Sequence, residues 1–197
     1  MADIELCEVS KRYGDKQVLQ NCSLCFPEHK ITALLGASGT GKTTVLRLIA
    51  GLETPDCGEI RGIVPGGVAM AFQEPRLFPS MTALENLCCV LHGSMRANAA
   101  RMRALLAEIG LEEAADRRAD TLSGGMAARV AFLRALVADR PVTLLDEPFS
   151  GVDTANRDRM AAMLRRMTAG KTIILVSHIP EEVGRLADCQ LMLQPMC

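Results

Sequence analysis

Residues 36–43 read Gly36-Ala37-Ser38-Gly39-Thr40-Gly41-Lys42-Thr43, and this stretch decides the fold. It matches the phosphate-binding loop pattern, in which a glycine, any four residues, Gly-Lys and then Ser or Thr follow one another. The apolar run at 31–35 predicts a buried strand before the loop, and the apolar spacing at 44–50 predicts a helix after it. The alternative is a glycine-rich turn that binds nothing, and the flanking strand and helix argue against it.

A strand, a glycine loop and a helix in this order form a site for a nucleoside triphosphate with Mg²⁺. The glycines let backbone N–H groups close around phosphate oxygens, and the helix N-terminus adds its partial positive charge. We therefore expect the whole loop, together with Thr44 directly after it, to bind the nucleotide. Lys42 is expected to reach the β- and γ-phosphates, and the Thr43 hydroxyl to bind Mg²⁺.

A second apolar run, at 142–145, ends in Asp146 and Glu147 and predicts another buried strand. Alone, two acids after such a run usually mark a strand that meets solvent. With the phosphate loop upstream, Asp146 is instead placed to hold Mg²⁺, directly or through water. Glu147 is placed to polarise an attacking water as general base. Pro148 then ends the strand.

The third element is Leu122-Ser123-Gly124-Gly125, which precedes a helical pattern at 126–138. Ser123 and the two glycines are therefore expected at a helix N-terminus, which is a second anion site. As an isolated tetrapeptide, a serine cap followed by glycines is ordinary, so its significance depends on the other two elements.

Taken together, these elements resemble the ATP-binding-cassette family of ATPases in order and spacing. The resemblance runs from Val9 to His178 and so covers nearly the whole chain. It implies an α/β fold: a phosphate-loop NTPase with a RecA-like parallel sheet. It further implies one ATP-binding domain over 1–197, with a helical subdomain inserted at about 79–135. The segment 71–86 resembles the importer group for nitrate, sulfonate and taurine.

The resemblance assigns a role to each matching residue. It implies that Tyr13 stacks on adenine, that Gln73 touches Mg²⁺ and water, and that Glu147 is the catalytic base. It also implies contacts to the γ-phosphate from the signature Ser123-Gly124-Gly125 and from His178, and a dimer-interface role for Asp153. Singly, each of these residues has an ordinary structural explanation. Met126 departs from the family, which usually has glutamine at this position. A thioether cannot hydrogen-bond as an amide does, so the contacts that this glutamine would make are absent.

The function that the resemblance implies is ATP hydrolysis with Mg²⁺, in a homodimer or heterodimer of ATPase subunits that drives a transporter. Expected partners are transmembrane permease subunits, at the cytoplasmic face of the membrane, and an extracytoplasmic solute-binding protein. The apolar run 77–79 is either part of the groove for the permease or plain core packing. The rival functions are a non-transport ATPase of iron–sulfur assembly or cell division, and the ATPase of an exporter.

Composition narrows the alternatives. The net charge of −1 and the 3% aromatic content argue against a nucleic-acid partner. No apolar run approaches the ~20 residues of a membrane-spanning helix, and the N-terminus lacks the pattern of a signal peptide. Among the eight cysteines, Cys22 and Cys25 fall in a probable strand, where they would point to opposite faces. Neither Cys88-Cys89 nor Cys197 completes a metal pattern, so we expect buried thiols in a reducing compartment.

Overall fold

The computed structural model describes residues 2–194, which form two compact units. The first unit comprises 2–70, 140–146 and 169–194, and the second comprises 71–139 and 147–168. Whether they act as one domain with a helical insertion at about 79–135 stays a prediction.

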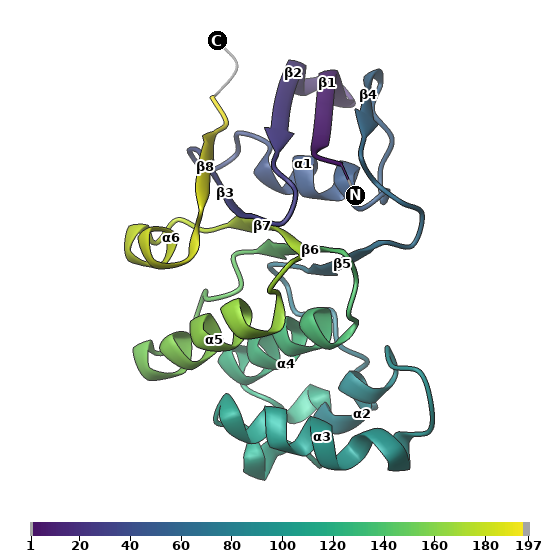
Figure 1. Cartoon of the computed structure of the whole chain (residues 1–197), viewed down its shortest axis with the longest axis vertical. Helices are drawn as coiled ribbons and strands as arrows, with labels where there is room; N and C mark the ends of the chain where they lie inside the picture. Colours follow the sequence, from purple (N-terminus) through teal and green to yellow (C-terminus); the bar gives the residue numbers. More distant parts are fainter. Residues whose placement is uncertain (1, 195–197) are drawn as a thin grey trace. The chain divides into compact units, whose positions relative to one another are not determined.

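The first unit contains two sheets (Figure 1). The larger has five strands in the order β5-β6-β7-β3-β8. Their bounds are β3 Ile31–Leu35, β5 Val68–Ala71, β6 Val142–Asp146, β7 Thr172–Val176 and β8 Cys189–Met192. Strand β3 pairs in parallel with β7 and β8, and β6 pairs in parallel with β7. The strands predicted from the apolar runs at 31–35 and 142–145 are therefore confirmed, and a third apolar run forms β7 beside them.

The second sheet is antiparallel, in the order β2-β1-β4. Strands β1 (Ile4–Tyr13) and β2 (Lys16–Phe26) are joined by a two-residue turn, in which Gly14 supplies the positive φ of 55°. Strand β4 covers Cys57–Arg61. Apolar residues of this sheet, including Ile4, Val9 and Phe26, share one buried core with helix α1 (Lys42–Ile49) and strands β3, β6 and β7. Helix α6 (Pro180–Leu186) follows β7.

The second unit is helical, with α2 (Ala83–Cys88), α3 (Met95–Glu108), α4 (Gly124–Val137) and α5 (Thr154–Met167). Two short 3₁₀ turns, η1 (Glu112–Ala114) and η2 (Ala119–Thr121), connect α3 to α4. A side chain caps each helix start: Thr82, Ser94, Ser123 and Asp153 accept from a backbone N–H in the first turn. Helix α3 begins in a polar stretch, where Ser94 caps it, seven residues before the apolar positions that start at Met102.

One expectation about burial is wrong. Among the cysteines within residues 2–194, only Cys88 is buried, whereas Cys25, Cys57 and Cys89 are exposed. Cys25 and Cys57 lie on β2 and β4, the edge strands of the antiparallel sheet, where alternate side chains face solvent. Cys197 lies outside the described residues.

Candidate functional site

The phosphate loop lies between the carboxyl end of β3 and the first turn of α1. Three of its residues require glycine-like backbone angles: Gly36, Gly39 and Gly41 have φ of 151°, 79° and 102°. A Cβ on Gly36 would lie 2.5 Å from the carbonyl oxygen of Leu193, and one on Gly41 would lie 3.2 Å from that of Val18. The backbone beside Gly36 therefore leaves no room for a side chain, and a side chain at Gly41 would be crowded as well as strained by the positive φ.

The exposed loop, the N-terminus of α1 and the Lys42 side chain are arranged as an anion site would require. Residues 37–39 are exposed, and no described side chain caps the N-terminus of α1, whose first turn contains no acid. The ammonium of Lys42 donates to the carbonyl oxygens of Gly36 and Ala37, at 2.8 Å each, so it lies over the loop. An uncapped helix N-terminus with a lysine beside it fits an anion, in agreement with the predicted triphosphate site.

Three strand ends bring further candidates to the same edge of the sheet. The register pairs Leu34 of β3 and Asp146 of β6 with Val176 of β7, so their carboxyl ends line up. His178 is exposed two residues beyond β7, and it lines a pocket of about 430 Å³ together with Gly36. The structure thus brings the start of the phosphate loop together with His178, the histidine predicted to contact the γ-phosphate.

The donors at this edge suit Mg²⁺. Asp146, only 2% exposed, offers carboxylate oxygens, and Thr43 offers a hydroxyl in the first turn of α1. Within residues 2–194, no three His, Cys, Asp or Glu side chains gather as a metal-binding group. Mg²⁺ needs only a small number of protein ligands, because it binds one or two carboxylates and completes its shell with phosphate and water.

Tyr13 is the last residue of β1 and is 42% exposed, which suits a stacking surface. Its hydroxyl donates to the carboxylate of Glu53. Burial, followed by this hydrogen bond, raises the pKa of Tyr13 above its ordinary value. Sequence reasoning missed Glu53, because 40 residues separate it from Tyr13 and it belongs to no recognised motif.

The signature residues lie where the sequence predicts, at the N-terminus of α4 in the second unit. Ser123 Oγ accepts from the backbone N–H of Met126 at 3.3 Å. A Cβ on Gly125 would lie 2.7 Å from the carbonyl oxygen of Gly151, so only glycine fits there, whereas Gly124 has open space around it. Arg129 donates back to the Gly125 carbonyl at 3.1 Å and fixes this turn.

The other candidates in this unit are Gln73, Glu147 and Asp153. Gln73 is exposed in the connection between β5 and α2. Glu147 follows Asp146 directly and has a positive φ of 50°, an uncommon angle for a residue with a side chain. Both carboxylate oxygens of Asp153 accept from Asn156, and the side-chain hydrogen bond is the main cause that lowers the pKa of Asp153.

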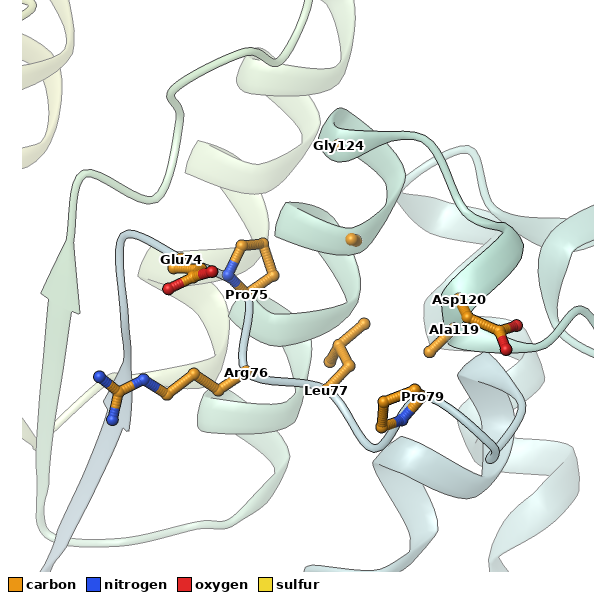
Figure 2. Close-up of a pocket in the computed structure, with 9 residues that line it drawn as sticks. Glu74, Pro75, Arg76, Leu77, Pro79, Ala119, Asp120 and Gly124 are labelled. Atoms are coloured by element: carbon orange, nitrogen blue, oxygen red, sulfur yellow. The ribbon is translucent and has the colours of Figure 1, made fainter.

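A pocket of about 430 Å³ lies in the second unit, lined by residues of the segment 74–79, by Ala119 and Asp120, and by the start of α4 (Figure 2). Leu77 and Pro79 point into it, and Gly124 and Ala127 of α4 line it. The guanidinium of Arg76 lies outside the pocket, 4.1 Å from the centre of the Phe72 ring. Phe78 is 51% exposed, which is not the burial that plain core packing of the run 77–79 would give.

Two residues that the sequence did not single out hold this pocket wall in place. Asn86 is fully buried, accepts from the N–H of Phe78 at 2.8 Å and donates to its carbonyl at 3.1 Å. Arg134 donates to the Arg76 carbonyl at 2.6 Å. An amide among the apolar residues of α2 was the available signal, since a buried amide needs hydrogen-bond partners.

Comparison with known proteins agrees with this geometry. The family described as ABC transporter matches residues 19–150. The aliphatic sulfonates import ATP-binding protein SsuB 1 of Nocardia farcinica is 42% identical over 192 residues, which is 96% of this chain and 77% of the relative. A solved ATP-binding subunit of an ABC transporter superposes with a TM-score of 0.87 at 25% identity, over 100% of this chain and 89% of that one. A dimeric ATP-binding cassette bound to ADP and Pi gives 0.84 at 27% identity, over 98% and 97%.

Proposed function

We propose that this chain, which belongs to the ABC transporter family of ATP-binding and ATP-hydrolysing subunits, powers the import of aliphatic sulfonates. The α/β phosphate-loop fold and the importer-group resemblance that the sequence predicted are confirmed. The observation that carries the sulfonate proposal is 42% identity, over 96% of the chain, to a sulfonate-import ATP-binding protein. Nitrate and taurine are the other solutes suggested by the segment 71–86.

The site residues receive the roles that the family pattern gives them. The phosphate loop and Thr44 bind the ATP phosphates, Tyr13 stacks on adenine, and Thr43, Asp146 and Gln73 hold Mg²⁺. The metal ion would neutralise charge on the phosphates. Glu147 takes the proton of the attacking water, and His178 contacts the γ-phosphate. Such catalysis is mainly positioning and charge stabilisation.

We also propose the assembly in which this site works. Two ATPase subunits, identical or homologous, pair so that Ser123-Gly124-Gly125 of one completes the site at the phosphate loop of the other. Asp153 lies at their interface. In this assembly, each chain acts as one domain, with the helical part at about 79–135 inserted in the ATPase core.

No helix within residues 2–194 is long and apolar enough to cross a bilayer. We propose that the chain sits peripherally at the cytoplasmic face, on permease subunits that receive solute from an extracytoplasmic binding protein. The pocket at Leu77 and Pro79 supports this, since Gly124 and Ala127 at the start of the signature helix line the same pocket.

The test is growth of a strain that lacks the gene, with an alkanesulfonate, taurine or sulfate as sole sulfur source. We expect loss of growth on the alkanesulfonate alone, rescue by the wild-type gene, and no rescue by Glu147→Gln. Growth unaffected on both organosulfur sources would refute sulfonate import. Co-purification with soluble assembly factors, and with no multi-span protein, would favour the iron–sulfur or cell-division function instead.

A further inference from the structure

Glu53 joins two parts of the first unit, the end of β1 and helix α1. One of its carboxylate oxygens accepts from the hydroxyl of Tyr13, at the end of β1. Its other oxygen accepts from the guanidinium of Arg47 at 3.4 Å. Arg47 lies on α1, the helix that begins at the phosphate loop. The Glu53 side chain is only 19% exposed, whereas its partners Arg47 and Tyr13 remain partly exposed.

A second set of contacts fixes the same strand end. The Lys11 ammonium lies 5.7 Å from the centre of the Tyr13 ring, within the range of a cation–π contact. That ammonium is held by the Thr54 carbonyl at 2.8 Å and by Asp56 at 3.2 Å. Asp56 also accepts from the backbone N–H of Arg12 at 2.7 Å. Residues 53–56 therefore anchor the ring by its hydroxyl, by one face and through the backbone beside it.

We propose that Glu53 is a positioning residue, which through Tyr13 and Arg47 sets the distance and orientation between the base-stacking ring and the phosphate loop. This inference rests on the proposed contact between Tyr13 and adenine. A ring that is already held in place loses less side-chain freedom when the nucleotide binds. More of the stacking energy therefore appears as affinity for the nucleotide. The effect should appear in affinity for the base and not in the hydrolytic step.

The chemistry of the pair agrees with this role. The pKa of Tyr13 is raised, by burial first and then by Glu53, although Thr44 and Arg47 act in the opposite direction. Tyr13 therefore remains a neutral phenol that can donate to the carboxylate at physiological pH. Glutamine can still accept this hydrogen bond through its carbonyl oxygen, whereas alanine cannot.

The test compares binding of ATP with binding of inorganic tripolyphosphate, which carries the charge and lacks the base. Glu53→Ala should raise the Kd and KM for ATP roughly threefold to tenfold, the worth of one hydrogen bond. It should leave tripolyphosphate binding and kcat unchanged, and Glu53→Gln should recover part of the loss. The control is Glu59→Ala, which removes an exposed ion pair with Arg61 on β4. It should change the affinity for neither ATP nor tripolyphosphate.

A double-mutant cycle separates positioning from general stabilisation. Tyr13→Phe removes the hydroxyl and keeps the ring, so its effect on ATP affinity should not add to that of Glu53→Ala. Additive losses, or equal weakening of tripolyphosphate, would overturn the proposal. If Tyr13→Ala binds ATP like the wild type, the adenine contact itself is wrong; if only that variant binds weakly, the role of Glu53 is wrong.

A spectroscopic readout needs no nucleotide. The chain has one tyrosine and no tryptophan, so its intrinsic fluorescence comes from Tyr13 alone. A carboxylate that accepts from a phenol quenches its emission, so Glu53→Ala should be brighter than the wild type and Glu59→Ala should not. Equal emission from wild type and Glu53→Ala, both folded by circular dichroism, would show that the hydrogen bond does not hold the ring in solution.

Discussion

Replacing Arg129 by methionine tests how the signature turn is held. Arg129 is only 8% exposed, and its guanidinium donates to the carbonyl oxygens of Ile109 at 2.7 Å, Gly125 at 3.1 Å and Gly110 at 3.2 Å. These carbonyls belong to the end of α3 and the start of α4. Burial lowers the pKa of Arg129, because removing the charged guanidinium from water is unfavourable. The hydrogen bonds to the three carbonyls offset this desolvation cost.

Methionine retains much of the apolar stem and removes the three hydrogen bonds that Nε and Nη1 donate, so the decrease in stability measures those bonds. At about 1 kcal/mol for each carbonyl left without its donor, the free energy of unfolding should fall by roughly 3 kcal/mol. In a chain of this size, 1 kcal/mol shifts the melting temperature by roughly 2–4 °C. The expected decrease in Tm is therefore roughly 6–12 °C.

The assay is urea and thermal unfolding followed by far-UV circular dichroism, with Arg103→Met as the matched control. Arg103 forms a shorter, two-pronged pair with Asp116, at 2.8 and 2.6 Å, but the two side chains are 46% and 71% exposed. Solvent screening should make the loss of stability in Arg103→Met much smaller than the loss in Arg129→Met. Equal losses in the two variants, or a larger loss for Arg103→Met, would refute the argument from burial.

Four further outcomes are expected from the proposed function. Glu147→Gln should keep ATP affinity and lose roughly 10²-fold or more in turnover, as for a lost general base; wild-type turnover would contradict the assignment. In light scattering, the same variant should be monomeric without ATP and dimeric with it, and a persistent monomer would point to a heterologous partner. Met126→Gln should hydrolyse ATP equally or modestly faster, so a loss above tenfold would show that methionine is required. Leu77→Asp should retain ATPase activity in the isolated chain and lose co-purification with a multi-span protein.

The fold was largely predictable because its deciding signals are local. The strands at 31–35, 142–146 and 172–176 are continuous apolar runs, and Ser123 caps a helix whose first residues are glycines. Helix α5 gave no comparable signal. Only Met160, Met163 and Leu164 of its 14 residues are buried, so its apolar stripe is narrow.

The site was predictable to the extent that its residues belong to motifs with fixed spacing. What could not be predicted are the side chains that support the motif residues from far along the chain. Glu53 lies 40 residues from Tyr13, and Arg134 lies 58 residues from the Arg76 carbonyl that it holds. Such pairs depend on tertiary packing, and no local propensity or period encodes them.

The pocket at Leu77 explains how a partner could act on the signature turn without touching nucleotide. Leu77 and Pro79 share this pocket with Gly124, the residue after the Ser123 cap. The segment 76–78 is fixed to α4 through Arg134 and to α2 through buried Asn86, so it is rigidly attached to both helices. On the proposed function, a permease segment seated there moves α4 and its capping serine together. The loss expected for Leu77→Asp follows, because a carboxylate in an apolar pocket must be desolvated when the partner binds.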